Sequence, residues 1–225
     1  MKKQIVIFLF ILESISCYSQ NSSPAFEIIE KYLRALGGRE KLKSIKTVRF
    51  EMEGILNGEK YNVKMILFKP RRMLAEFAGP GHIEKRVLNG DQHVRILNGE
   101  KVPLADSDLV GMIEDSKIFP ALTYEQDGYK VMVHGEKPYF PGYIEVELIT
   151  ASYKRRVHYY NIETGLLGRV LNDSGIEYNY SEYAEFEGIL YPTKVMLKVS
   201  GREMEYRVTK IEFNLKVKSK LFRVK

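Results

Sequence analysis

The chain has 225 residues, 44% of them hydrophobic and 28% charged, with a formal net charge of +6. These values are typical of a globular protein with a substantial core, and they exclude an intrinsically disordered chain and a multi-span membrane protein. Lysine and arginine are dispersed rather than gathered in one block, which argues against nucleic-acid binding and leaves open a weak attraction to anionic membrane surfaces or acidic partners. The 15 tyrosines and 11 phenylalanines favour β-strands.

The first residues predict a secretory signal peptide. Two lysines precede an apolar run at residues 5–12, which is far shorter than the roughly 20 residues of a transmembrane helix. Small residues stand where a signal peptidase cleaves, and we expect cleavage near Ser19 and Gln20. This removes residues 1–19, leaves 20–225 as a single mature domain without a transmembrane span, and places the protein in the periplasm.

Cys17 is the only cysteine, and it supports an alternative for the N-terminus. Lipidation would make Cys17 the first residue of a membrane-anchored lipoprotein. With ordinary cleavage the mature chain has no cysteine, so it forms no disulfide and no cysteine metal site. Its fold then depends on its core alone.

A helix is predicted directly after the signal peptide. Ser23 is a favourable N-cap, Pro24 is a favourable first helical residue, and apolar residues then recur at helical spacing. Gly37 ends this helix, which covers residues 24–36, and residues 39–44 add one further turn.

From Thr47 the hydrophobic period changes to two, with Val48, Phe50 and Met52 alternating with charged residues. This pattern is typical of a half-buried antiparallel strand. Turn sequences such as Asn-Gly and Gly-Pro-Gly separate similar segments, which predicts a meander of adjacent strands. We predict about twelve strands, which are the one from Thr47 and those at residues 61–68, 73–78, 83–88, 92–97, 129–134, 143–150, 153–160, 166–171, 176–186, 193–199 and 202–213.

One stretch, residues 103–124, interrupts this alternation and is predicted to be helical. Asp106 or Ser107 can cap a helix there, and Phe119 followed by Pro120 ends it. The strand series therefore has one helix before it and one helical insert within it.

The predicted fold is mainly β (α+β), an unclosed antiparallel β-barrel or half-barrel capped by short helices around a hydrophobic cavity. A long sheet that curls without closing must fill its concave side with its own side chains, with helices or with a ligand. An apolar site of this kind suits acyl chains. Alternation directs ten apolar side chains into it, namely Phe50, Met52, Val63, Met65, Leu67, Phe77, Val146, Leu148, Val195 and Leu197.

The sequence resembles the periplasmic lipoprotein carriers of the LolA and LolB type, together with the wider group of outer-membrane lipoprotein-sorting proteins. The similar segments are residues 32–38 with 42–45, residues 159–166, residues 188–194, and the closing segment 210–222. Each encodes a turn or a strand edge, and their order along the chain carries the resemblance. It implies an unclosed β-barrel, or half-barrel, capped by helices around a hydrophobic cavity, and it does not imply a specific cargo.

Sequence patterns for catalysis or metal binding are not found. His82, His93, His134 and His158 are scattered over different segments, without the spacing of a zinc site. The sequence around Asp106 lacks the spaced oxygen ligands of a calcium loop, and no nucleophile elbow or phosphate-binding glycine loop occurs. We therefore expect no catalytic residue, metal or cofactor.

Several glutamates could in principle form paired carboxylates for acid–base chemistry. Alternation places several of them on the outside of the sheet, where no partner that would raise a pKa can be named. They are Glu145, Glu147, Glu177, Glu182, Glu185 and Glu187.

Two non-enzymatic functions remain. The first is a carrier that binds an acyl chain in the concave cavity under a helical lid. The second is a cell-envelope module with a self-filled core that binds an envelope protein through an outer loop. The loop at residues 137–142, with Tyr139 and Phe140, is the candidate contact for the second function.

Overall fold

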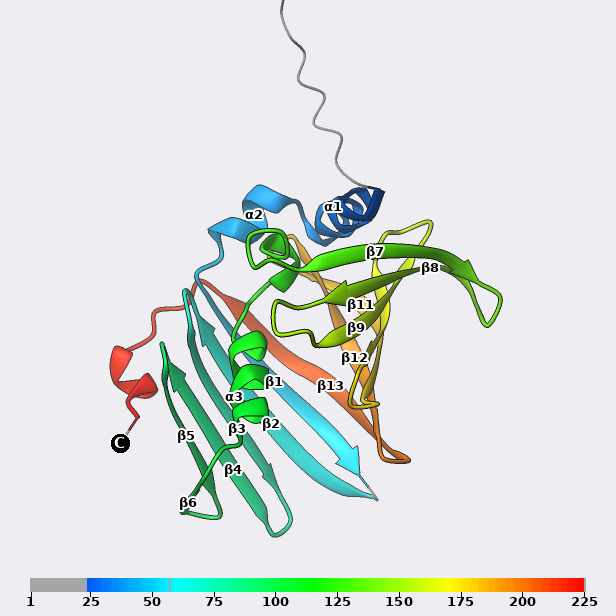
Figure 1. Ribbon diagram of the computed structural model, residues 1–225. Helices are drawn as coiled ribbons and strands as arrows, with labels where there is room; N and C mark the ends of the chain where they lie inside the picture. Colours follow the sequence, from blue (N-terminus) through cyan, green and yellow to red (C-terminus); the bar gives the residue numbers. More distant parts are fainter. Residues whose placement is uncertain (1–23, 57, 225) are drawn as a thin grey trace, which may run out of the picture.

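The computed structural model describes residues 24–56 and 58–224, which form one antiparallel sheet (Figure 1). Its strand order is β6-β5-β4-β3-β2-β1-β13-β12-β11-β10-β9-β8-β7, so every neighbouring pair is consecutive in the chain except β1 and β13. The strands are β1 (Thr47–Leu56), β2 (Glu59–Phe68), β3 (Arg72–Gly79), β4 (His82–Asn89), β5 (Gln92–Leu97), β6 (Glu100–Val102), β7 (Lys130–Lys137), β8 (Phe140–Ile149), β9 (Arg155–Asn161), β10 (Leu167–Asn172), β11 (Glu177–Phe186), β12 (Ile189–Val199) and β13 (Arg202–Phe213).

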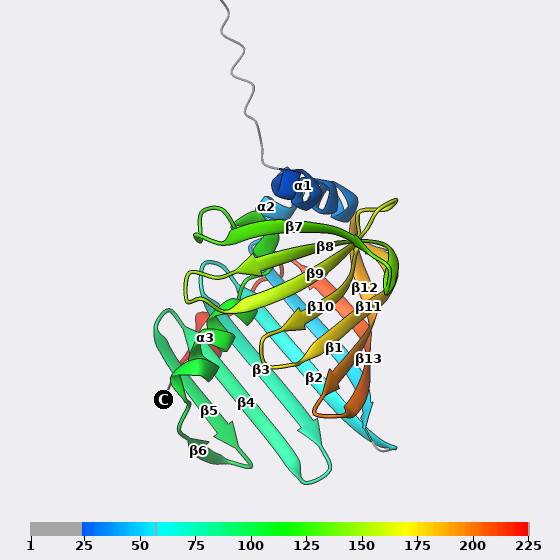
Figure 2. The same cartoon turned by 45° about the vertical axis from the view of Figure 1, so that its right-hand side comes forward.

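The sheet curves strongly, and the first six strands and the last strands form two walls that face each other (Figure 2). Three helices lie on the concave side or at its upper end: α1 (Pro24–Leu36), α2 (Arg39–Ser44) and α3 (Asp106–Asp115). The short 3-10 helix η1 (Pro120–Leu122) follows α3, and a second, η2 (Ser219–Phe222), lies against the outer face. Within the described residues β6 and β7 remain unpaired edges, so the barrel is not closed.

The main core lies where α1, α2 and η1 meet one end of the concave face. In α1 the buried residues Ile29, Leu33 and Leu36 follow the helical period, so a single apolar stripe packs onto the sheet. Tyr32 of α1 lies beside Tyr160 of β9, with ring centroids 5.3 Å apart. The strands contribute Val48, Phe50, Leu67, Met73, Ala75, Leu88, Val146, Leu148, Tyr160, Ile189, Ile211 and Phe213 to this core.

A smaller cluster covers the outer face of β2, β3 and β4. Ile66, Leu74 and Val87 are buried there by Phe222, which η2 presents with 1% exposure. These strands are therefore apolar on both faces, which is why their sequences alternate less cleanly than that of β1.

The predicted fold class is confirmed, since the chain forms a mainly β, unclosed antiparallel sheet with few short helices. The strand count was one too low, because β6 has only three residues and too few side chains to show a period. The predicted cap of the second helix was also wrong. Ala105 is the N-cap of α3 and makes no side-chain cap bond, whereas Asp106 and Ser107 lie in the first turn. The predicted loop 137–142 is shorter, because β7 extends to Lys137 and β8 begins at Phe140.

The predicted signal peptide at residues 1–19, the mature start at Gln20, the lipidation of Cys17 and the cap at Ser23 lie outside the described residues.

We predict that Phe222→Ala lowers the free energy of unfolding by about 3 kcal/mol, because it removes the side chain that closes the outer cluster. Chemical denaturation of the purified protein measures this change. Leu221→Ala is the matched control, since Leu221 is 39% exposed and its loss should cost less than about 0.5 kcal/mol. Equal losses for the two variants would contradict the assigned packing.

Candidate functional site

The strand register places the ten predicted cavity residues on the concave face. Phe50 is opposite Met65, and Met52 is opposite Val63. Cross-strand partners point to the same side of a sheet, so these side chains share one face. Strand pairing places the other six residues on this face as well. They are Leu67, Phe77, Val146, Leu148, Val195 and Leu197.

Burial divides the ten residues into two groups. Five are buried. Four of them belong to the main core under the helices, namely Phe50, Leu67, Val146 and Leu148, and the fifth, Val63, lies outside that core. The other five keep accessible surface: Met52, Met65, Phe77, Val195 and Leu197. The helices thus fill one end of the concave face, while the other end presents an apolar lining to water.

Tyrosines extend this lining along β11 and β12. The rings of Tyr178 and Tyr180 are stacked with centroids 6.4 Å apart, and Tyr191 packs on Phe50. Burial raises the pKa of the Tyr191 hydroxyl to about 12 and also raises those of Tyr178 and Tyr180, so all three stay neutral. Neutral phenols offer apolar ring faces together with hydroxyl groups, which suits a ligand with polar and apolar parts.

His158 is a buried polar residue on the same face. Its Nδ1 lies 3.0 Å from the hydroxyl of Tyr160, while its Nε2 is buried without a partner among the described residues. Burial, and secondarily the charge of Arg156, lowers the pKa of His158 to about 3. The ring is therefore neutral at any physiological pH. Sequence reasoning found no zinc-site spacing around this histidine and did not place it at the site.

Four of the glutamates considered for acid–base chemistry lie in polar networks on the outer face, namely Glu145, Glu147, Glu177 and Glu182, whereas Glu185 and Glu187 are exposed. Glu145 accepts hydrogen bonds from the hydroxyls of Tyr139 (2.6 Å) and Tyr159 (2.8 Å). Burial opposes the charged form of Glu145, but these bonds outweigh it and hold its pKa below the ordinary value. Arg155 and His134 do the same for Glu147. A carboxylate kept ionised by donors is a poor general acid.

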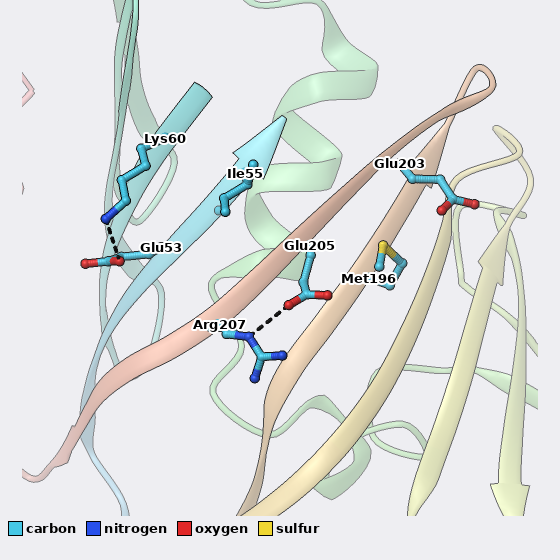
Figure 3. A pocket seen from close by; sticks show the side chains of 8 residues that line it. Glu53, Ile55, Lys60, Met196, Glu203, Glu205 and Arg207 are labelled. Atoms are coloured by element: carbon cyan, nitrogen blue, oxygen red, sulfur yellow. Dashed lines mark ion pairs between the residues drawn. The ribbon is translucent and has the colours of Figure 1, made fainter. Parts of the chain in front are cut away.

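Two hollows lie on the outer face rather than the concave one. The larger, of about 410 Å³, lies beside β1, β12 and β13, and Figure 3 shows its lining. The lining is mostly charged, and its groups pair with one another, as Lys60 does with Glu53 at 3.6 Å and Arg207 with Glu205 at 2.8 Å. The second, of about 350 Å³, lies between β4, β5 and η2. Neither is lined by a predicted site residue.

Within residues 24–56 and 58–224, no three histidine, cysteine or acidic side chains come together as a metal site would require. The helices of the described part are all too short or too polar to cross a bilayer.

Strand order, curvature and helix placement together define an open antiparallel half-barrel with a partly covered inner face. Solved structures share this architecture. A LolA superfamily protein from Nitrosomonas europaea matches with a TM-score of 0.59 and 12% identity over 90% of this chain and 99% of that one. A protein described as an outer membrane lipoprotein-sorting domain, from Vibrio parahaemolyticus, matches with a TM-score of 0.56 and 12% identity over 88% and 95%.

A protein of the DUF1329 family from Desulfovibrio piger matches similarly, with a TM-score of 0.58 and 11% identity over 90% of this chain and 98% of that one. A scan against family models and a search of curated proteins gave no match to the sequence. The chain therefore has the LolA-like fold, and the likeness is one of structure.

We predict that His158 makes the protein less stable as the pH falls below 6.5. The unfolded chain accepts a proton on this ring that the folded protein excludes, so the free energy of unfolding drops by about 1.4 kcal/mol per pH unit until the pH approaches the folded pKa of about 3. In His158→Gln the loss between pH 7.5 and pH 5 should shrink by about 2 kcal/mol. Denaturation curves at both pH values measure it.

The raised pKa of Asp115 acts in the opposite direction, and it is present in both proteins, so the comparison isolates His158. An equal loss of stability in the wild type and in His158→Gln would show that the ring is accessible to protons in the folded state.

Proposed function

We propose that this protein is a non-catalytic periplasmic carrier that binds the acyl chains of lipids or lipoproteins on the open part of its concave face. The observation that carries the proposal is the half-buried apolar lining formed by Met52, Val195 and Leu197, which lie outside the core cluster, together with Phe77 at its border. The fold supports it, because a lipoprotein-sorting domain has the same architecture.

The energy of such binding is sufficient. Each buried methylene contributes about 0.8 kcal/mol, so roughly fifteen of them supply about 12 kcal/mol, from which association subtracts at least about 4 kcal/mol. The remaining value of about 8 kcal/mol corresponds to a dissociation constant of about 1 μM. Reversible carriage needs this range, because the ligand must be held during transit and then released.

Helix α3 is the element suited to control access. It crosses the concave side of the sheet (Figure 2). Among the side chains of α3 that the structure describes, Met112 alone belongs to the buried core, and Leu109 and Ile113 pack at its border. Its middle residue, Gly111, weakens the helix by about 1 kcal/mol relative to alanine. A helix held by so few apolar contacts can open at a low cost in free energy.

We predict that Leu197→Asp weakens binding of a fluorescent fatty acid at least about tenfold, because it places a charge in the apolar lining. Met196→Asp is the matched control. Met196 is the next residue of β12, is similarly half-buried and lines the outer hollow, so its change should leave binding within about twofold. Fluorescence titration of the purified mature protein measures both.

Equal loss in both variants would contradict a site on the concave face. No uptake by the wild-type protein, together with a bare polypeptide mass after mild purification from the envelope, would favour the envelope-module alternative. For that alternative, Tyr139 is the best contact residue, because it is 65% exposed at the β7–β8 turn.

A further inference from the structure

Arg156 carries a positive charge on the concave face without a carboxylate beside it. It lies on β9 opposite Leu148 of β8, and it alternates with His158 and Tyr160, which face the core. Its neighbour Arg155 points outward and is bound to Glu147. In the part of the chain that the structure describes, no carboxylate lies within ion-pair distance of Arg156, although its side chain is half-buried.

The opposing charge comes from α3. The helix contains four acidic residues and no basic one, and Asp115 stands at its C-terminal end. An acidic group there is unfavourable for the helix dipole, so its position needs compensation. The surrounding protein raises the pKa of Asp115, and the charges of Arg156 and Arg86 partly offset that rise. Asp115 nevertheless keeps accessible surface, so water reaches its carboxyl group.

Among the arginines of this face, Arg156 differs from the others in having no ion pair. Arg86 and Arg95 share the buried carboxylate of Glu84, with contacts of 2.6 and 2.7 Å. Arg156 has no such contact among the described residues, so its charge is not directly neutralised. Uncompensated positive charge in a half-buried site favours an anion.

Tyr178 joins this charged region to the apolar lining. It is opposite Val170 of β10 on one side and opposite Leu197 of β12 on the other. Val170 in turn is opposite His158, whose buried Nε2 has no partner in the described residues. Asp115 and Arg156 both act on the pKa of the Tyr178 hydroxyl, which burial raises. Charged and apolar surfaces are therefore continuous across four neighbouring strands, β9 to β12.

We propose that the ligand is an anionic amphiphile whose carboxylate or phosphate head binds Arg156, while its chain lies on the lining at Val195 and Leu197. Asp115 is the internal counter-ion that the anionic head replaces. This inference rests on the proposed function and narrows it, since a carrier for acyl chains alone needs no cation beside its apolar lining.

The test measures the binding of three amphiphiles with the same dodecyl chain to the mature protein by calorimetry, below their micellar concentrations. Dodecyl phosphate is anionic, dodecyl phosphocholine is zwitterionic and dodecyl maltoside is neutral. We expect dodecyl phosphate to bind about tenfold tighter than dodecyl maltoside, the effect of one charge-assisted hydrogen-bonded contact. Inorganic phosphate, which lacks the chain, should bind far more weakly.

Three variants assign the preference to residues. Arg156→Gln should abolish the anion preference while leaving dodecyl maltoside affinity unchanged, which also shows that the variant is folded. Asp115→Asn should raise dodecyl phosphate affinity about threefold or more, because the internal competitor is gone. Arg155→Gln, the adjacent arginine on the outer face, is the control and should change neither affinity.

Equal binding of all three amphiphiles, or an anion preference that survives in Arg156→Gln, would overturn this inference and leave the acyl-carrier proposal standing. Inorganic phosphate binding as tightly as dodecyl phosphate would also overturn it, since the site would then be an anion site without a chain subsite. Binding of none of the amphiphiles would contradict the carrier proposal itself.

Discussion

The packing of α1 and η1 against one end of the concave face is the contact on which the rest of the structure depends. Leu33 of α1 is fully buried there, and Phe119, which precedes η1, meets Phe213 of β13 at 6.4 Å. A helix of 13 residues is about 20 Å long, whereas thirteen strands about 4.8 Å apart span roughly 60 Å. These helices are therefore too short to cover the sheet, and an apolar part of its inner face is left facing water.

Charge is distributed differently on the two faces. On the outside, acids and bases neutralise each other at close range, as Arg169 does with Glu177 at 2.8 Å. These ion pairs on the surface contribute little to stability, and they leave no net charge that would attract a ligand. On the concave face Arg156 has no such partner among the described residues, so an unpaired charge lies inside the curve of the sheet. An interior of this kind is costly for folding alone, which points to a role in binding.

Alternation in the sequence was enough to predict the open half-barrel and the shared face of its apolar residues, because strands such as β1 have one apolar and one charged side. It was not enough to show which of those residues the helices bury. Phe50 and Met52 look alike in sequence, yet only Phe50 lies under the core. That difference depends on helix length and placement, which come from long-range packing.

The charged part of the site could not be predicted, because its residues come from elements far apart in the chain. Arg86, Asp115 and Arg156 lie on β4, α3 and β9, and none belongs to a motif. On β9 the order Arg155-Arg156-Val157-His158 puts polar residues on both faces of the strand. Alternation along β9 therefore does not show which face is buried. The one usable signal was α3 itself, whose four acids without a base need a cationic surface opposite them.

The position of Asp115 on α3 couples headgroup binding to movement of the helix. Met112 and Asp115 are one turn apart, so the apolar contact that holds α3 and the carboxylate whose charge an anionic head would replace belong to one rigid element. A ligand that takes over the arginines removes the electrostatic part of the attachment and leaves Met112 to hold the helix. Opening and binding are then one equilibrium, and the ligand shifts it only by its difference in affinity for the two states.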